Sequence, residues 1–410
     1  MPTSAADSAV QPGSGRNLAV FGITSLLNDT ASEMAYWILP AFLLSIGAGP
    51  AKLGLIEGIA ESVASFAKLF SGYFADRSPR RKPIVVFGYA LANVVKPILA
   101  VATSWWQVLI IRFADRASKG IRGAPRDVML AESVEKEKIG SAFGLLQAMD
   151  SAGAILGPAI ALLLLARFGM RGVFWAASVP GLLTIGVVAW GARETKHRLP
   201  KSAPADMTIS NTSAPLPFSF YYVLIAVTLF SLGNSSDMFL ILRAQSAGIA
   251  SRYAPLLGLV FNTLYTAVSW PAGKLSDRGS KSAMAAAGYI VFAIVYLTFA
   301  AAPAKSALWM AMAGYGFYYA LTDPVLRALV AQTIAPESRG RAFGIFFFVT
   351  SITTLLASLL TGQLWKYFGP RLPLTLSAGL ALLAAAMLFF SPSPSPHAKA
   401  GPLESREHLA

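Results

Sequence analysis

Apolar stretches of about twenty residues follow one another along most of the chain, and short polar segments separate them. A helix of ~20 residues spans the ~30 Å hydrocarbon core of a bilayer. In lipid a segment must satisfy its own backbone hydrogen bonds, and these continuous apolar runs therefore predict helices. A transmembrane β-barrel is disfavoured, because its strands would alternate apolar and polar side chains. The pattern predicts an all-α membrane protein.

Twelve transmembrane helices are expected. Their approximate bounds are 17–46, 51–76, 83–103, 105–132, 139–168 and 172–192 in the first half, and 218–245, 254–276, 282–302, 306–333, 340–368 and 371–390 in the second. Between the halves, residues 193–217 are rich in Pro, Ser, Lys and Arg, which is typical of a flexible linker. Residues 1–16 and 391–410 are polar and rich in Ser and Pro, and we expect both to be disordered.

The two halves repeat one sequence pattern. The segment Gly72-x-x-x-Asp76-Arg77 recurs about 200 residues later as Gly273-x-x-x-Asp277-Arg278, and Ala142-Phe143-Gly144 recurs at the same distance as Ala342-Phe343-Gly344. Internal repeats of this length are common in membrane transporters. We therefore expect two pseudo-symmetric six-helix bundles, residues 17–192 and 218–390, joined by a cytoplasmic linker at 193–217.

Composition agrees with a membrane protein. Hydrophobic residues make up 55% of the chain and charged residues only 13%, whereas a soluble domain carries about 25% charged residues. The net charge of +14 arises mostly in the loops after the even-numbered helices. We expect the protein to lie in the inner or plasma membrane of the cell. The positive-inside rule then places both termini and the linker on the cytoplasmic side. This charge distribution does not indicate nucleic-acid binding.

Catalytic and cofactor motifs are lacking. The sequence has no cysteine and three histidines without metal-binding spacing, and it lacks a Gly-Lys-Ser/Thr phosphate loop. No cofactor, metal or ATP-driven step is predicted. An intramembrane enzyme is the rival class, but it would need a nucleophile–base pair or a metal cluster, and neither is found. The expected partners are a small-molecule substrate, protons and the lipid bilayer, and a monomer is expected.

Several motifs carry a family resemblance over roughly residues 18–390. The repeats, the central linker and the doubled Gly-x-x-x-Asp-Arg loop resemble the major facilitator superfamily of secondary transporters. Arg116-Ala-Ser-Lys119-Gly120 is similar to the family's Arg-x-x-Gln-Gly, with Lys in place of Gln. Gly153-Ala-Ile-Leu-Gly157-Pro158 resembles the helix-packing element of its twelve-helix drug–proton antiporter branch, although small residues occur wherever membrane helices pack closely. The resemblance implies alternating access, with a substrate site at the midplane between two bundles.

The doubled loop is a candidate cytoplasmic gate. A carboxylate is favourable at a helix N-terminus, so Asp76 is expected to face the start of the helix near Gly340, and Asp277 the start of the helix near Gly140. The alternative is that these loops only determine topology. The full set of predicted gating residues is Gly72, Asp76, Arg77, Arg81, Gly273, Asp277, Arg278, Asp323 and Arg327.

Charged residues inside the predicted helices are costly in lipid and usually face a cavity. Asp29 and Glu33 lie one turn apart on one helix face, and Asp29 is ~17 Å from the helix start, near the midplane. Structural ion pairs, for instance Asp29 or Glu33 with Arg112 or Arg116, are an equally open interpretation. The predicted coupling and cavity residues are Asp29, Glu33, Arg112, Asp115, Arg116, Lys119, Asp150, Asn234, Asp237, Asn262, Tyr265, Tyr315 and Tyr319.

Proton-coupled efflux of a small molecule is the predicted function, with Asp29 as first choice for the proton-binding group and Glu33 as second. The alternative is proton-coupled uptake of an organic anion or nutrient, because Arg116 and Lys119 place cations inside the membrane. The aromatic residues of the second half could line the substrate cavity, or they could simply pack between helices.

Overall fold

The computed structural model describes residues 14–195, apart from 79, 136 and 137, and residues 216–390, apart from 279, 303, 333 and 335–338. The described residues are almost entirely helical and contain no β-strand, which confirms the predicted fold class. The predicted disordered ends and most of the predicted linker lie outside these residues.

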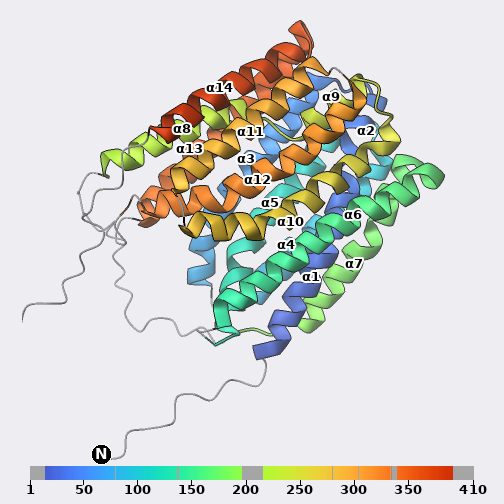
Figure 1. Ribbon diagram of the computed structural model, residues 1–410. Helices are drawn as coiled ribbons and strands as arrows, with labels where there is room; N and C mark the ends of the chain where they lie inside the picture. The colour runs from blue at the N-terminus through green and yellow to red at the C-terminus, as the bar shows by residue number, and fades with distance from the viewer. Residues whose placement is uncertain are drawn as a thin grey trace, which may run out of the picture.

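The first half consists of six rods, each a helix or a run of consecutive helices, which can be followed in Figure 1. They are α1 (Ser14–Tyr36) with α2 (Leu39–Ser45), α3 (Pro50–Arg77), α4 (Lys82–Val95) with η1 (Lys96–Val101), α5 (Trp105–Glu132), and the two arms of α6 (Ile139–Ala176), the second continuing through α7 (Ser178–Gly186) and η3 (Val187–Gly191). The arms of α6 meet at Gly169, whose φ of 64° lies in the left-handed region that glycine adopts without steric cost.

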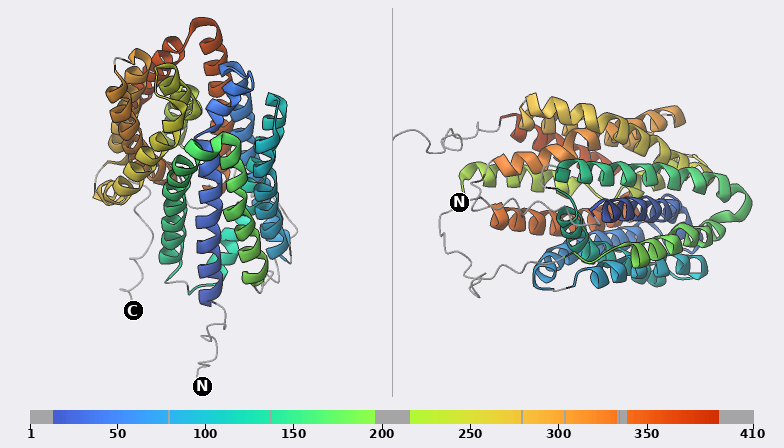
Figure 2. Two further views of the ribbon diagram at one scale, coloured as in Figure 1. Left: turned by 90° about the vertical axis from the view of Figure 1, so that its right-hand side faces the viewer. Right: turned by 90° about the horizontal axis from the view of Figure 1, so that it is seen from below.

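The second half repeats this arrangement. Its rods are α8 (Phe218–Gly233) with α9 (Met238–Ser246), α10 (Ala254–Arg278) preceded by η4 (Ser251–Tyr253), α11 (Lys281–Ala301), α12 (Lys305–Gln332), α13 (Arg339–Phe368) and α14 (Arg371–Phe389). Because successive rods run in opposite directions, α1 begins and α14 ends at the same end of the molecule. We call this the terminal end and the opposite one the far end. The first half, blue to green, and the second half, yellow to red, lie side by side in Figure 2.

The first and seventh rods are broken, although the sequence predicted single helices there. Pro40 lies at the start of α2 and has no N–H to donate to the carbonyl of Tyr36, and its ring would clash with that carbonyl in a continuous helix, so α1 ends at Tyr36 and the chain turns at Trp37 and Ile38. Residues 234–237 read Asn-Ser-Ser-Asp, and such side chains compete with helical backbone hydrogen bonds. The two breaks therefore have local causes, and they fall at equivalent places in the two halves.

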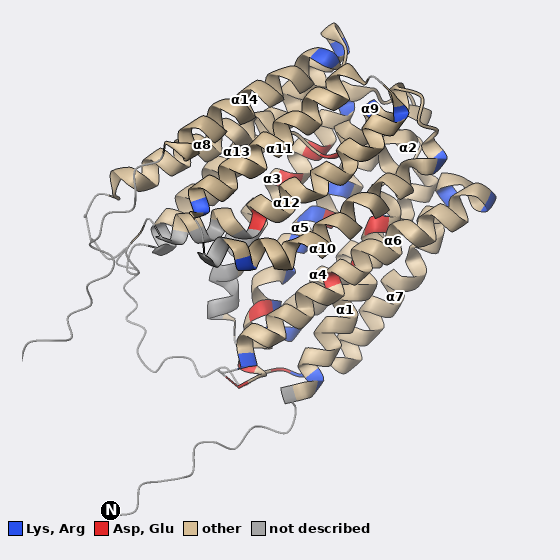
Figure 3. Cartoon of the chain, in the orientation of Figure 1, with Lys and Arg blue, Asp and Glu red and all other residues tan. Residues whose placement is uncertain are grey.

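Apolar surface surrounds a more polar interior. Among the described residues, six helical segments are long and apolar enough to span a membrane: Lys82–Val101, Ile139–Gly191, Phe218–Ser246, Lys281–Ala301, Gly344–Phe368 and Arg371–Phe389. The charged rods α3 and α5 fall outside this group, yet Glu57 and Arg112 on them are buried. Figure 3 shows mostly uncharged outer helices, with acidic residues mainly in the middle of the bundle and basic residues both there and at the helix ends. Charges on α3 and α5 therefore face the interior of the protein.

Small residues join the halves near the far end. A Cβ added at Gly362 of α13 would lie 2.8 Å from the carbonyl oxygen of Pro50, and one added at Gly58 of α3 would lie 3.1 Å from Leu355. Gly54 likewise approaches the carbonyl oxygen of Ser358. Glycine lets helix backbones come this close, as is common between membrane helices. The far-end parts of α3 and α13 are thus packed backbone to backbone.

Candidate functional site

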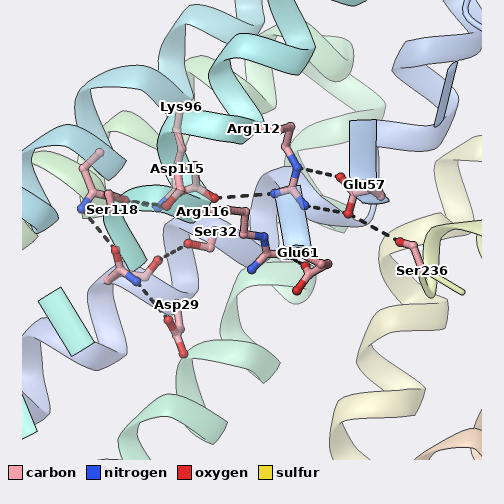
Figure 4. Close-up of polar contacts among 12 residues, drawn as sticks. Asp29, Ser32, Glu57, Glu61, Lys96, Arg112, Asp115, Arg116, Ser118 and Ser236 are labelled. Carbon is pink, nitrogen blue, oxygen red and sulfur yellow. Dashed lines mark hydrogen bonds and ion pairs between the residues drawn. The ribbon is translucent and has the colours of Figure 1, made fainter. Parts of the chain in front are cut away.

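A buried ion pair joins α3 to α5 at the centre of the polar interior (Figure 4). The Nε and Nη2 groups of Arg112 each donate a 2.8 Å hydrogen bond to one carboxylate oxygen of Glu57. The Glu57 side chain is 0% exposed. Two parallel bonds match the planar guanidinium to the carboxylate, which is the strongest geometry available to such a pair. Glu57 is not among the site residues predicted from the sequence.

The ion-pair network extends along α5. Asp115 lies 3.6 Å from both the Arg112 guanidinium and the Lys96 ammonium group, and Arg116 lies 2.9 Å from Glu61 (Figure 4). The suggested pairing of Asp29 or Glu33 with Arg112 or Arg116 is wrong. Glu57 and Glu61 lie one turn apart on α3 and pair with two arginines one turn apart on α5, because these two helices pack along their length.

Polar contacts also cross from the first half to the second. The hydroxyl of Ser236, in the break between α8 and α9, donates to Glu57 over 3.5 Å. The backbone N–H of Ser236 donates to the hydroxyl of Ser358 on α13 over 3.2 Å. Further toward the terminal end, the amide of Asn262 on α10 donates to the carbonyl oxygen of Ala154 on α6 over 2.7 Å. The buried network therefore contacts residues 234–237, the non-helical segment between α8 and α9.

Asp29 and Glu33 have neutral hydrogen-bond donors. The amide of Asn28 donates to Asp29 over 3.0 Å, and the indole of Trp37 donates to Glu33 over 2.7 Å. Both carboxylates face the close contact between α1 and α6. A Cβ added at Gly153 would lie 3.0 Å from the Asp29 Cβ, and one at Gly157 would lie 2.7 Å from the Glu33 Cβ. The Gly-x-x-x-Gly-Pro segment thus brings α6 against the acidic face of α1.

A cavity of about 240 Å³ lies in the terminal-end half of the first bundle. The helices α1, α3, α4, α5 and α6 line it with Ser25, Asn28, Asp29, Ala64, Ser65, Tyr89, Lys119, Gly120, Arg122, Gly123, Arg126, Asp127 and Asp150. Three of the predicted residues, Asp29, Lys119 and Asp150, meet here. Two lining cations, Arg122 and Arg126, were missed, although they continue the stripe of Arg112, Arg116 and Lys119 at helical spacing.

Only part of this cavity's charge is paired. Arg126 lies 2.9 Å from Asp127 and donates to the Ser25 hydroxyl over 3.3 Å. Arg122 is 6% exposed and places its guanidinium 4.5 Å from the Tyr89 ring centre. Neither Arg122 nor Lys119 has a carboxylate of the described residues within ion-pair distance.

The second half holds a carboxylate among tyrosines. The hydroxyl of Tyr315 donates to Asp237 over 2.7 Å, and that of Tyr319 lies 3.2 Å from both Asp237 oxygens. The ring of Tyr265 lies 5.9 Å from that of Tyr319. The amide of Asn234 donates to the Tyr318 hydroxyl over 3.3 Å. Of the predicted residues of this half, five therefore gather at the α8–α9 break, whereas Asn262 contacts the first half.

The predicted gate lies at the terminal end, and only part of it is described. Arg81 is buried, its guanidinium lies 2.8 Å from Glu132 at the end of α5, and its backbone N–H donates to Glu194 over 3.0 Å. Gly273 lies in α10 and Asp323 in α12. For the remaining gating residues the structure describes only the helical backbone. These residues are Gly72, Asp76, Arg77, Asp277, Arg278 and Arg327.

Known proteins of the same architecture match this chain along nearly its whole length. The profile described as Major Facilitator Superfamily matches residues 21–246 and again residues 219–409. The chain belongs to the major facilitator superfamily. An uncharacterized MFS-type transporter of Methanocaldococcus jannaschii is 33% identical over 383 residues, which cover 92% of this chain and 94% of that protein.

Two further likenesses are more distant. The multidrug resistance protein MdtG of Escherichia coli is 23% identical, over 90% of this chain and 93% of its own length. The crystal structure of the nucleoside transporter NupG superposes with a TM-score of 0.74 at 12% identity, covering 91% of this chain and 98% of that one. Membership of this family makes the protein a membrane transporter and not an enzyme.

Proposed function

We propose that this protein exports a small organic solute in exchange for protons, by alternating access. The packed far end and the cavity toward the terminal end are what a carrier open to one side requires. If the termini are cytoplasmic, as the loop charges predict, this is an inward-facing arrangement.

The observation that carries proton coupling is the pair of carboxylates in the cavity. Asp29 and Asp150 both line it, and neither has a cation of the described residues within ion-pair distance. Without a fixed counter-ion, a carboxylate beside a cavity can be neutralised in turn by a proton or by a cationic group of a solute. Coupling requires only that the proton binds the two states of the carrier with different affinity.

Export rather than uptake is supported by two observations. The relative MdtG is named as a multidrug resistance protein, and it aligns with nine-tenths of this chain. The Gly153–Gly157 segment, which resembles an element of drug–proton antiporters, lies against Asp29 and Glu33. In an antiporter, proton and solute must compete, and a close contact between α1 and α6 lets movement of either helix change the surroundings of these carboxylates.

Inside-out vesicles with an acidified interior provide the test. A pH-sensitive dye reports loss of the gradient when a transported solute is added from a panel of organic cations, anions and zwitterions. We expect at least one solute to release lumenal protons in vesicles that contain the protein, and none in vesicles that lack it. Proton coupling is wrong if a labelled solute moves at the same rate with and without the gradient.

Proton-linked uptake of an organic anion is the second candidate, and the unpaired Lys119 and Arg122 in the cavity favour it. In that case solute and protons would move in the same direction. The same panel, applied to right-side-out vesicles with an acidic exterior, should then show solute accumulation that follows the inward gradient. Accumulation there, with no proton release from inside-out vesicles, would replace export with uptake.

A further inference from the structure

The cavity carries its unpaired charges on different helices. Lys119 and Arg122 belong to α5, whereas Asp29 belongs to α1 and Asp150 to α6. The remaining two charged residues, Arg126 and Asp127, lie 2.9 Å apart and form an ion pair with each other. What the cavity offers a ligand is therefore two cations from one helix and two carboxylates from two others.

This contrasts with the deeper network between α3 and α5. There, every cation has a carboxylate within 3.6 Å: Glu57 for Arg112, Glu61 for Arg116 and Asp115 for Lys96. The charges of this network are thus paired, whereas four of the six charged residues that line the cavity have no oppositely charged group within ion-pair distance among the described residues. Unpaired charges inside a membrane protein are costly and commonly mark the path of a substrate or an ion.

Other lining groups are polar as well. The Tyr89 side chain is part of the wall and is 1% exposed. Ser65 and Asn28 add further hydrogen-bonding groups to the wall. The cavity therefore suits a small, strongly polar solute better than an apolar one.

A ligand with one kind of charge would leave half of the site unsatisfied. A monocation would pair with Asp29 and Asp150 but would be repelled by Lys119 and Arg122. A monoanion would pair with the two cations but would be repelled by the two carboxylates. A solute that carries both charges can satisfy both sets at once.

We propose that the substrate is a small zwitterion, with its cationic group at Asp29 and Asp150 and its anionic group at Lys119 and Arg122. This inference rests on the proposed transport function and specifies the solute of that same cavity. It is compatible with exchange for protons, because the cationic group and the proton compete for the same carboxylates. The chemistry is that of an amino acid or a similar amphoteric metabolite.

Matched ligands test the substrate class directly on the purified full-length protein. The probes are free amino acids, their C-terminal amides, which are cations, and their N-acetyl derivatives, which are anions. A ligand that binds only the folded state raises the apparent melting temperature by mass action. We expect at least one free amino acid to stabilise the protein more than its amide or its N-acetyl derivative at equal concentration.

Lys119→Gln removes the accessible cation of the site. We expect it to weaken binding of the zwitterion about tenfold, equivalent to about 1.4 kcal/mol, while binding of the corresponding amide is unchanged or improved. Lys366→Gln is the matched control, because Lys366 is exposed on α13 beside Tyr367 and does not line the cavity. This control should bind both ligands as the parent protein does.

The proposal is overturned if no amino acid stabilises the protein, if the amides do so equally well, or if Lys119→Gln leaves the preference unchanged. These results are distinct from a failure of proton exchange. A zwitterion that binds in a Lys119-dependent manner but moves no protons in vesicles would leave the substrate class intact and refute the coupling.

Discussion

Glu57 and Arg112 illustrate at the residue scale how charged helices are accommodated in the interior. Both side chains are buried, and two 2.8 Å hydrogen bonds satisfy each partner. Such a pair adds little stability compared with an apolar contact. Removal of one partner, however, leaves the other charge buried without a counter-ion, which costs about 3–5 kcal/mol. Asp115 offers Arg112 a second carboxylate only at 3.6 Å.

Glu57→Gln should therefore lower the free energy of unfolding by about 3 kcal/mol, because Arg112 loses its bidentate counter-ion. Thermal unfolding of the purified protein measures the effect. Glu135→Gln is the control, since Glu135 pairs with Lys138 over 2.8 Å at an exposed turn, where a pair contributes less than about 1 kcal/mol. Equal shifts in the two variants would contradict a structural role for the buried pair.

The sequence could predict that charges on α5 share one face, because helical spacing determines which side chains lie together. It could not predict their partners. Whether Arg112 meets Glu57 or Asp29 depends on how α5 is rotated against α3 and α1, and spacing within one helix carries no information on that rotation. Arg122 and Arg126 could have been predicted as site residues, since they continue the same row of cations at helical spacing along α5.

At the scale of elements, the far end is held by backbone contact between α3 and α13. Gly54, Gly58 and Gly362 each lie where a Cβ would press on the neighbouring helix. The hydroxyl of Ser62 on α3 also donates to the carbonyl oxygen of Ser351 on α13 over 3.1 Å. Alternating access requires this contact to open when the terminal end closes.

Gly362→Val should hold the far end apart, because its Cβ would lie 2.8 Å from the Pro50 carbonyl oxygen and 3.2 Å from the Ala51 Cα. A cysteine placed at Ser62, which is buried in this contact, reports the opening. We expect an impermeant thiol reagent added to intact cells to label it several-fold faster than in the parent. Gly379→Val is the control, because an added Cβ there meets nothing within 4 Å. Equal labelling of the two variants would show that the α3–α13 contact does not close the far end.

The gate at the terminal end remains a prediction from the doubled loop. Asp76→Asn should remove the anionic partner expected at the start of α13 and slow transport several-fold, with less effect on substrate affinity because the loop is expected to lie far from the bilayer midplane. Asp277→Asn should act in the same way but more mildly, since its loop has fewer cations. A transport assay in vesicles measures both, and a parental rate in Asp76→Asn would remove the gate role.

Most element positions follow from the apolar periodicity, and their bounds agree with the structure to within a few residues. The breaks at Trp37–Ile38 and at residues 234–237 do not follow from it. An apolar run long enough to span a bilayer continues through both, and only the local chemistry of Pro40 and of Asn-Ser-Ser-Asp interrupts the helix. The Asp237 site is a consequence of the second break.

At the scale of the whole molecule, the two halves are copies of one pattern with different chemistry. The first half pairs carboxylates with arginines and lysine, whereas Asp237 in the second half is held by tyrosine hydroxyls. The duplication was visible in the sequence through the Asp-Arg and Ala-Phe-Gly repeats. The cavity was not, because a void arises from the packing of five helices.

The predicted orientation in the membrane rests on loop charge alone, and one position tests it. A cysteine at Ser202, in the predicted cytoplasmic linker, should react with an impermeant thiol reagent only after the cells are permeabilised. The natural chain has no cysteine, so the signal comes from that position alone. Labelling of intact cells would reverse the predicted topology and would place the terminal end outside the cell.

Asp29→Asn tests the central claim of proton-coupled transport most directly. The variant keeps the size of the side chain and can still form a hydrogen bond with Asn28, but it cannot gain or lose a proton. In proteoliposomes with saturating solute, exchange at equal pH should persist because Asp150 remains to bind the cationic group, while accumulation driven by a pH gradient should be lost. If the variant accumulates solute against its gradient as well as the parent protein does, Asp29 is not the coupling group.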